Sequence, residues 1–152
     1  MKKYKLNQGQ SMFEVLVAIF IISLITVGVI VVSTNSVSNS SFSRNSTLAG
    51  RYAQEGIEWV RDEKTKDIIL FKAKVAQSTY CLDNLVWTNI NICGAAEYIT
   101  GSNNVFKREV KLANTLISGK NVIEAEVKVY WTDPKGIHEV KSVTNFSDIR
   151  EK

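Results

Sequence analysis

Proline is almost absent from this sequence of 152 residues, in which Pro134 is the only one. Because proline is the residue that most strongly interrupts a helix, nothing before residue 134 forces a helix to break. Histidine is also scarce, since His138 stands alone, and we therefore expect no metal site. The sequence has no glycine-rich phosphate loop and no spacing that fixes a Ser–His–Asp triad. These absences predict no enzyme activity, no cofactor and no small-molecule substrate.

Charge is missing from the 18 residues between Val15 and Val32. Only Ser23, Thr26 and Gly28 interrupt the large apolar side chains of this segment. As a helix, the segment is roughly 27 Å long, which is close to the ~30 Å hydrocarbon thickness of a bilayer. The pattern predicts a membrane-spanning helix near the N-terminus.

The formal net charge of +4 is concentrated at the N-terminus, where Lys2, Lys3 and Lys5 precede Gly9. Without these first nine residues, 16 basic residues face 15 acidic residues. The basic residues form no single cluster, so nucleic-acid binding is not indicated. By the positive-inside rule, the three lysines place the N-terminus in the cytoplasm.

Glu14 is the unexpected residue at the start of the apolar segment. A carboxylate in hydrocarbon costs about 3 kcal/mol even on lenient scales, so such a group usually has a partner. A secretory signal peptide would have a shorter, uncharged apolar region and a small-residue cleavage site. An ordinary single-span anchor explains the length and the lysines but leaves Glu14 at the headgroup boundary without a role.

The chain after Val32 is first rich in Ser, Thr and Asn, which are weak helix formers. Apolar residues then recur at spacings of three, four and seven, which predicts one apolar face of a helix that continues to about Lys64. These residues are Phe42, Ala49, Tyr52, Ala53, Gly56, Ile57 and Val60.

The remainder of the chain is rich in predicted β-strands. Residues 106–112 alternate in polarity, and residues 122–131 place apolar side chains on one face and charged ones on the other. A turn at Thr132–Gly136 contains Pro134 and leads into a returning strand at residues 137–146. Residues 67–101 are the least regular part, with a short helix near residues 68–76 and strand fragments after it.

The N-terminal motif resembles the class III signal of type IV pilins and of the pseudopilins of type II secretion. A short basic leader ends at Gly9, the mature chain would begin at Gln10, and Glu14 is the fifth residue after the glycine. The segment "YAQEGIEWVR" adds a likeness to minor pilins in particular. The resemblance implies an α+β fold, in which a long N-terminal helix, membrane-spanning in its first half and amphipathic in its second, packs on a small antiparallel sheet.

The resemblance also implies a domain organisation and a set of partners. The leader would be 1–9, the membrane or filament-core helix 10–33, the amphipathic half 34–65 and the extracytoplasmic head 66–152. A prepilin peptidase would cut after Gly9 and methylate the new amino terminus. The subunit would sit in the inner membrane with its N-terminus cytoplasmic and then join other pilin subunits in a pilus or a periplasmic pseudopilus. There the amine of Gln10 and the carboxylate of Glu14 would be each other's partners during assembly.

Two alternatives to a minor pilin remain at this point. The first is a type II secretion pseudopilin, which has the same processing chemistry but forms a short periplasmic filament. The second is a single-span anchored adhesin or receptor that never polymerises and keeps residues 1–9.

Cys81 and Cys93 are the only cysteines. On the outer side of a membrane, an isolated pair is most often a disulfide, and a loop this short contributes about 3 kcal/mol when closed. Two buried free thiols are the alternative.

We expect cleavage between Gly9 and Gln10. Intact-mass measurement of native protein should find a chain that begins at Gln10 and carries one added methyl group. Gly9→Val should block processing, because a β-branched side chain crowds the peptide next to the scissile bond. A chain that still begins at Met1 in cells with an active prepilin peptidase would contradict this prediction.

Overall fold

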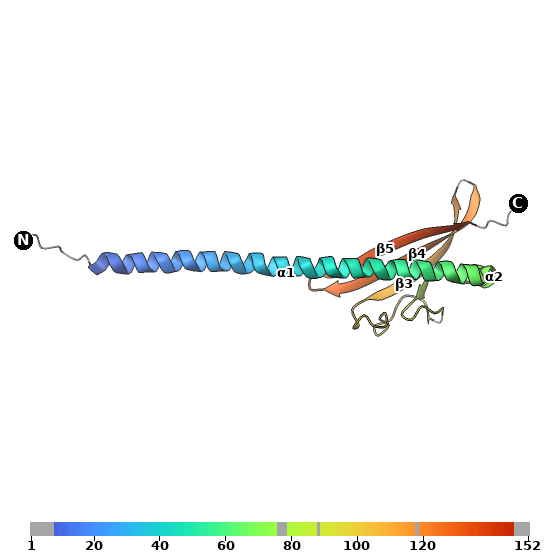
Figure 1. Ribbon diagram of the computed structural model, residues 1–152, viewed down its shortest axis with the longest axis horizontal. Coiled ribbons are helices and arrows are strands. Elements are labelled where there is room, and N and C mark those ends of the chain that lie inside the picture. Colours follow the sequence, from blue (N-terminus) through green and yellow to red (C-terminus); the bar gives the residue numbers. More distant parts are fainter. Residues whose placement is uncertain (1–7, 76–78, 88, 118, 148–152) are drawn as a thin grey trace, which may run out of the picture. The chain divides into compact units, whose positions relative to one another are not determined.

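The computed structural model describes residues 8–75, 79–87, 89–117 and 119–147 (Figure 1). The chain forms two compact units, of which the first ends at Ser43 and the second begins at Arg44. The elements, in chain order, are α1 (Gln8–Lys66), α2 (Ile68–Val75), β1 (Thr79–Cys81), β2 (Asn89–Ile90), β3 (Lys107–Ile117), β4 (Lys120–Asp133) and β5 (Gly136–Ser147). We call the second unit the head.

Helix α1 is a single element of 59 residues, as expected for a stretch without proline. It ends at Lys66, and Asp67 separates it from α2. The carboxylate of Asp67 accepts hydrogen bonds from the backbone N–H groups of Ile69 (2.9 Å) and Leu70 (3.0 Å), which caps the N-terminus of α2. The short helix expected near residues 68–76 is therefore present as α2.

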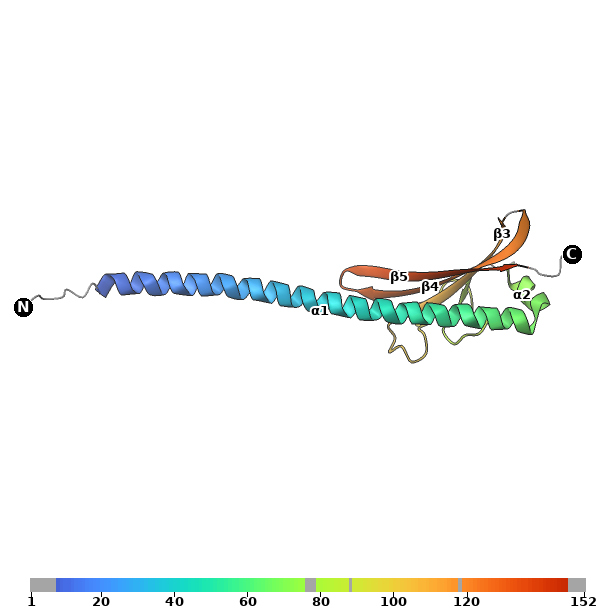
Figure 2. The same ribbon diagram turned by 45° about the horizontal axis from the view of Figure 1, so that its top comes forward.

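The head contains a five-stranded sheet in the order β2-β1-β3-β4-β5, and every neighbouring pair is antiparallel (Figure 2). The two long hairpins share β4, which pairs residue by residue with β3 on one side and β5 on the other. Val127 is at the centre of this arrangement, opposite Val110 on β3 and Ser142 on β5. The alternation that predicted strands 106–112, 122–131 and 137–146 is confirmed.

The core of the head lies between the C-terminal part of α1 and one face of the sheet. Ala49, Ala53 and Val60 on α1 are no more than 1% exposed, as are Val127 and Val129 on β4. This burial confirms the coarse expectation of an α+β head with an N-terminal helix packed on an antiparallel sheet. Phe42, which we placed on the same helix face, is instead 41% exposed, because it precedes the point where the head begins.

The head begins within α1, not at its end. The domain organisation implied by the resemblance placed the head at 66–152, after an amphipathic half at 34–65. In the structure, residues from Arg44 onward belong to the head, since Ala49, Ile57 and Val60 are part of its core cluster. The last part of α1 is thus a core element of the head.

Gly56 is the point of closest approach between α1 and the sheet. A Cβ atom on Gly56 would lie 2.9 Å from Cγ1 of Val127 and 3.1 Å from Cδ of Arg108. Gly50, two turns earlier on the same helix, has nothing within 4 Å of such an atom. The side chain of Val127 has little freedom to move, because it is fully buried and β-branched.

We expect Gly56→Ala to lower the free energy of unfolding by about 1–3 kcal/mol, since the added methyl overpacks a closed contact. Gly50→Ala is the matched control and should raise it by about 0.5–1 kcal/mol, because alanine is the better helix former. Denaturant unfolding of the detergent-solubilised chain measures both. Shifts in the same direction would show that Gly56 has no special packing role.

Candidate functional site

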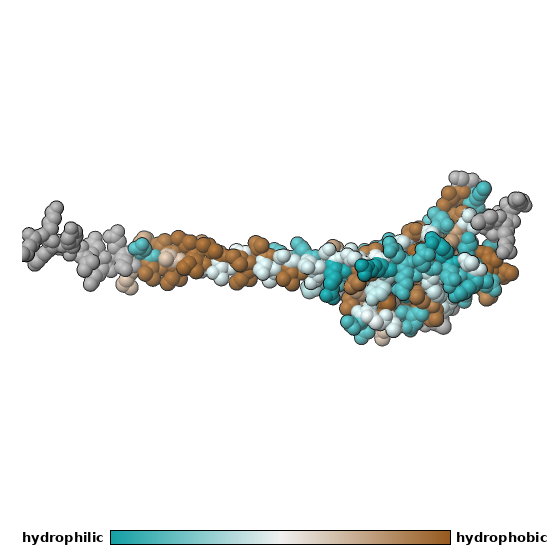
Figure 3. Space-filling view, viewed as in Figure 1, coloured by the Kyte–Doolittle hydropathy of each residue, from teal (hydrophilic) through white to brown (hydrophobic). Residues whose placement is uncertain are grey.

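The first candidate site is the apolar segment of α1 between Met12 and Val32. Its large hydrophobic side chains are 40–73% exposed, and none of the segment is buried inside the structure. On the face drawn in Figure 3, most of this segment is hydrophobic. The helix is long and apolar enough to cross a membrane. A helix that is apolar all round requires an apolar environment all round.

Three hydroxyl groups in and just after this segment donate hydrogen bonds within the helix. Ser23 donates to the carbonyl oxygen of Phe20 at 2.7 Å, and Thr26 donates to that of Ile22 at 2.8 Å. Thr34 likewise donates to the carbonyl oxygen of its own preceding turn. Such back-bonding removes the need for water at these positions, so they do not disturb the apolar character of the surface.

The structure places the three predicted processing residues on consecutive turns of one helix. Gly9 and Gln10 lie in the first turn of α1, and Glu14 lies four residues after Gln10 and is exposed. Residues four apart share one face of a helix, so the backbone of Gln10 and the side chain of Glu14 are neighbours along α1. The leader residues 1–7 and the side chains of residues 8–11 lie outside the described part of the structure, and so does the predicted pairing of the Gln10 amine with Glu14.

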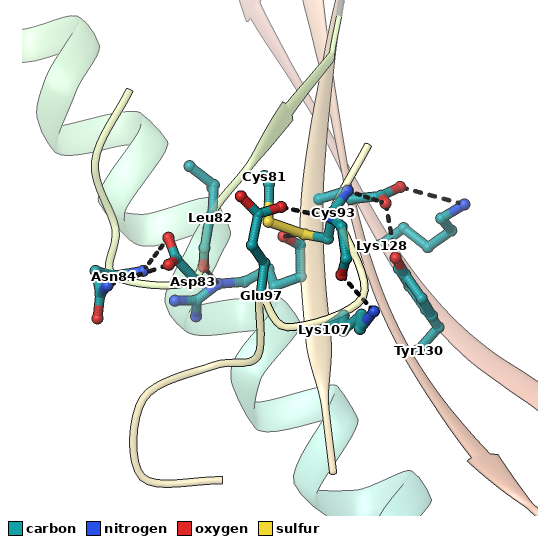
Figure 4. The surroundings of a disulfide bond; sticks show 12 residues. Cys81, Leu82, Asp83, Asn84, Cys93, Glu97, Lys107, Lys128 and Tyr130 are labelled. Carbon is teal, nitrogen blue, oxygen red and sulfur yellow. Dashed lines mark hydrogen bonds and ion pairs between the residues drawn. A yellow bond between two sulfur atoms is a disulfide. The ribbon is translucent and has the colours of Figure 1, made fainter. Parts of the chain in front are cut away.

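The second candidate site surrounds the two cysteines (Figure 4). Cys81 and Cys93 form a disulfide with an S–S distance of 1.98 Å and a Cα–Cα distance of 4.8 Å. Both are buried, at 0% and 8% exposure. The bond joins the end of β1 to the loop that precedes β3, and it closes the irregular segment between them. The carboxylate of the nearby Glu97 lies within 4.8 Å of both sulfur atoms. Because these two sulfur atoms are bonded to each other, neither is a thiolate that could bind an ion together with Glu97.

Arg108 is the residue of this region that the sequence did not single out. It is 1% exposed and donates to the carbonyl oxygens of Leu82 and Tyr52, each at 3.1 Å. Its Nη1 also donates to Oε2 of Glu55 on α1 at 2.7 Å. Burial lowers the pKa of Arg108, and the Glu55 carboxylate partly offsets this shift. One side chain therefore joins α1, β3 and the residue that follows β1.

Glu109 makes a second set of bonds on the opposite face of the sheet. Its Oε1 accepts from the backbone N–H of Cys93 at 2.9 Å and from the hydroxyl of Tyr130 at 2.8 Å, and its Oε2 lies 3.5 Å from Nζ of Lys128. Burial raises the pKa of the Tyr130 hydroxyl, and its hydrogen bond to Glu109 raises the pKa further. The disulfide loop is thus fixed to the sheet through both of its ends.

Both sets of bonds connect parts of the head to each other. Every polar group of Arg108 and Glu109 that is described above contacts backbone or a fixed side chain, which is the pattern of a structural brace. His138, the single histidine of the chain, is half-buried, with Nε2 2.9 Å from Oδ1 of Asp133 and its ring 5.3 Å from that of Trp131. The hydrogen bond from His138 lowers the pKa of Asp133.

Comparison with known proteins finds no matching family model, no matching curated sequence and no matching solved structure.

The Arg108–Glu55 pair should matter more than an exposed pair on the same helix. We expect Glu55→Gln to lower the free energy of unfolding by about 1–2 kcal/mol, because the buried guanidinium loses its counter-charge. The value stays moderate because Glu55 itself is half-exposed.

Glu58→Gln is the matched control. Glu58 lies three residues further along α1 and pairs with Arg61 at 2.8 Å, but both side chains are more than half exposed. Its loss should change stability by less than about 0.5 kcal/mol. Equal effects from Glu55→Gln and Glu58→Gln in denaturant unfolding would contradict a special role for Arg108.

Proposed function

We propose that this chain is the structural subunit of a type IV pilus-like filament, with minor pilins as the nearest class. It is processed by a prepilin peptidase between Gly9 and Gln10 and assembles through the apolar segment of α1. The head then faces away from the cytoplasm, in an extracellular pilus. The activity is assembly, and no step of it requires a cofactor.

The observation that carries this proposal is the position of Glu14. It stands four residues after the proposed new terminus, at the beginning of a helical surface on which Val15–Val32 offers no charge and no internal burial. An acidic residue there is costly in a lone membrane helix. The cost is removed when a cationic amine lies nearby, as the terminus of a cleaved neighbouring subunit would in a bundle of such helices.

The head is consistent with the same proposal. Filament growth from a membrane requires a helix that leaves the bilayer and a domain that folds outside it. Here one element, α1, supplies both the exposed apolar segment and a core helix of the head. The Cys81–Cys93 disulfide suits a head in an oxidising compartment. A pseudopilin remains the nearest alternative, because every feature named here serves a periplasmic filament equally well.

The test separates assembly from membrane insertion. Glu14→Ala should leave insertion intact, since the loss of a charge favours a membrane helix. It should severely reduce the amount of subunit in sheared surface filaments, because the Gln10 amine then lacks its counter-charge in a low-dielectric bundle. Glu14→Asp keeps the charge but shortens its reach by one methylene, so we expect a partial defect.

The control is Glu58→Ala, which removes an exposed carboxylate from the head part of the same helix. It should enter filaments at the wild-type level. The measurement is the ratio of filament subunit to membrane subunit for each variant. If Glu14→Ala enters filaments as well as the wild type, the assembly role of Glu14 is wrong and a non-polymerising anchored adhesin or receptor is the better explanation.

A further inference from the structure

The sheet of the head has one long open edge, which is formed by β5. In the strand order β2-β1-β3-β4-β5, the opposite edge is the two-residue strand β2, whereas β5 has 12 residues. No strand in the described part of the chain pairs with the outer side of β5. An open edge of this length presents unpaired N–H and C=O groups and is a template for another strand.

The turn before β5 determines which of its residues face the open edge. Asp133 and Gly136 are paired across a two-residue turn, so they exchange hydrogen bonds with each other. Every second residue from Gly136 onward therefore bonds to β4. The N–H and C=O groups of the residues between them point to the open edge, and these residues are Ile137, Glu139, Lys141, Val143 and Asn145.

The side chains of the same residues follow a self-complementary order. Along one face of β5 the order is Ile137, Glu139, Lys141, Val143, which reads apolar, acidic, basic, apolar. Ile137 is 75% exposed and Val143 is 52% exposed, so both offer apolar surface on this face of the strand. When a second copy of β5 is laid antiparallel to the first with the two Val140 residues opposite each other, each apolar residue of this set faces an apolar residue of the other copy. Each charged residue then faces a residue of opposite charge.

We propose that β5 pairs with β5 of a second copy of this chain, antiparallel and about a two-fold axis at Val140. In this register Ile137 faces Val143 of the other copy and Glu139 faces Lys141 of the other copy. Because the contact is two-fold symmetric, each of these pairs occurs twice. Opposite charges and apolar pairs directly across antiparallel strands stabilise their association.

The charges also select this register over its neighbours. A shift by two residues in one direction places Lys141 opposite Lys141 of the other copy, and a shift in the other direction places Glu139 opposite Glu139. Both shifts put like charges directly across the strands, which is destabilising. Lysine commonly protects an open edge from pairing, but Lys141 already lies 3.3 Å from Glu139 and 4.0 Å from Glu126. Lys141 therefore already has acidic neighbours on this surface.

The direction of β5 determines how two copies meet. In Figures 1 and 2, β5 runs along the head in the same direction as the head part of α1. A two-fold axis reverses this direction in the second copy, so the chain enters the two heads, at Arg44, from opposite ends. The contact thus brings two heads together in opposite orientations, and it does not depend on how α1 assembles.

A thiol at the symmetry axis tests the pairing directly. Residue 140 of each copy would form a non-hydrogen-bonded pair, with a Cα–Cα distance of about 4.5 Å, which is within the range of a disulfide. No free cysteine competes, since Cys81 and Cys93 are bonded to each other. The full chain carrying Val140→Cys, in detergent and under mild oxidation, should form a covalent dimer on a non-reducing gel.

Thr144→Cys is the matched control, because Thr144 lies on the same strand and face and is also half-buried. In the proposed register it faces Gly136 of the other copy, and the two Thr144 residues are roughly 27 Å apart. It should form at least tenfold less covalent dimer than Val140→Cys. Equal dimer from both thiols, or none from Val140→Cys, would overturn the proposal.

Charge reversal provides the second readout and excludes dimers held by α1 alone. In the Val140→Cys chain, Glu139→Lys should reduce the covalent dimer on the order of tenfold, because both cross-strand pairs become repulsive. Lys141→Glu should do the same. The two reversals together restore opposite charges and should restore the dimer, as should mixing the two single variants. Dimer that is unaffected by the single reversals, or not restored by the double one, would refute the pairing.

Discussion

The close contact between α1 and β4 is the constraint on which the head depends. Gly56 gives the sheet room for Val127, which lies at the centre of β4 with β3 and β5 on its two sides. The alanines on the same helix face, Ala49 and Ala53, are also small and fully enclosed. Small residues let the backbone of a helix approach a sheet closely, so the large side chains of the sheet fill the space between them. The position of α1 on the sheet follows from this fit.

The same close approach explains why a charged residue is tolerated in the core. Arg108 lies beside Gly56 and passes from β3 under α1, so that its guanidinium reaches the carbonyl oxygen of Tyr52 and the carboxylate of Glu55. A buried arginine is costly unless its hydrogen bonds are satisfied. Here the partners are two backbone carbonyls and a half-exposed acid, and all come from elements that the core already holds in place. The arginine therefore adds specificity to the position of α1 more than it adds stability.

The sequence predicted the features that depend on periodicity. Strand β4 alternates from Ile123 to Trp131, and the structure buries Ala125, Val127, Val129 and Trp131 as expected. The sequence did not predict the burial of Glu109. This residue lies on the polar face of β3, yet it is 5% exposed because the disulfide loop covers it. Such burial arises from a segment without periodicity, so no local pattern signals it. Arg108 did leave a signal, since it shares the inward face with Phe106, Val110 and Leu112, and a charge at an inward position predicts a buried partner.

The apolar segment of α1 and the open edge of β5 differ in the partner that each requires. The apolar segment of α1 needs an apolar environment on all sides and can find it in lipid or among copies of itself. The edge of β5 needs only one strand, and its alternating charges make another copy the best match. A strand pair of this length covers far less area than a stable dimer requires, so a single contact is weak. If α1 assembles the subunits into filaments as proposed, many such edges lie on one object and many weak contacts act together. Assembly through α1 would then turn a weak interaction of single heads, which a thiol at residue 140 can trap, into a lasting one between filaments.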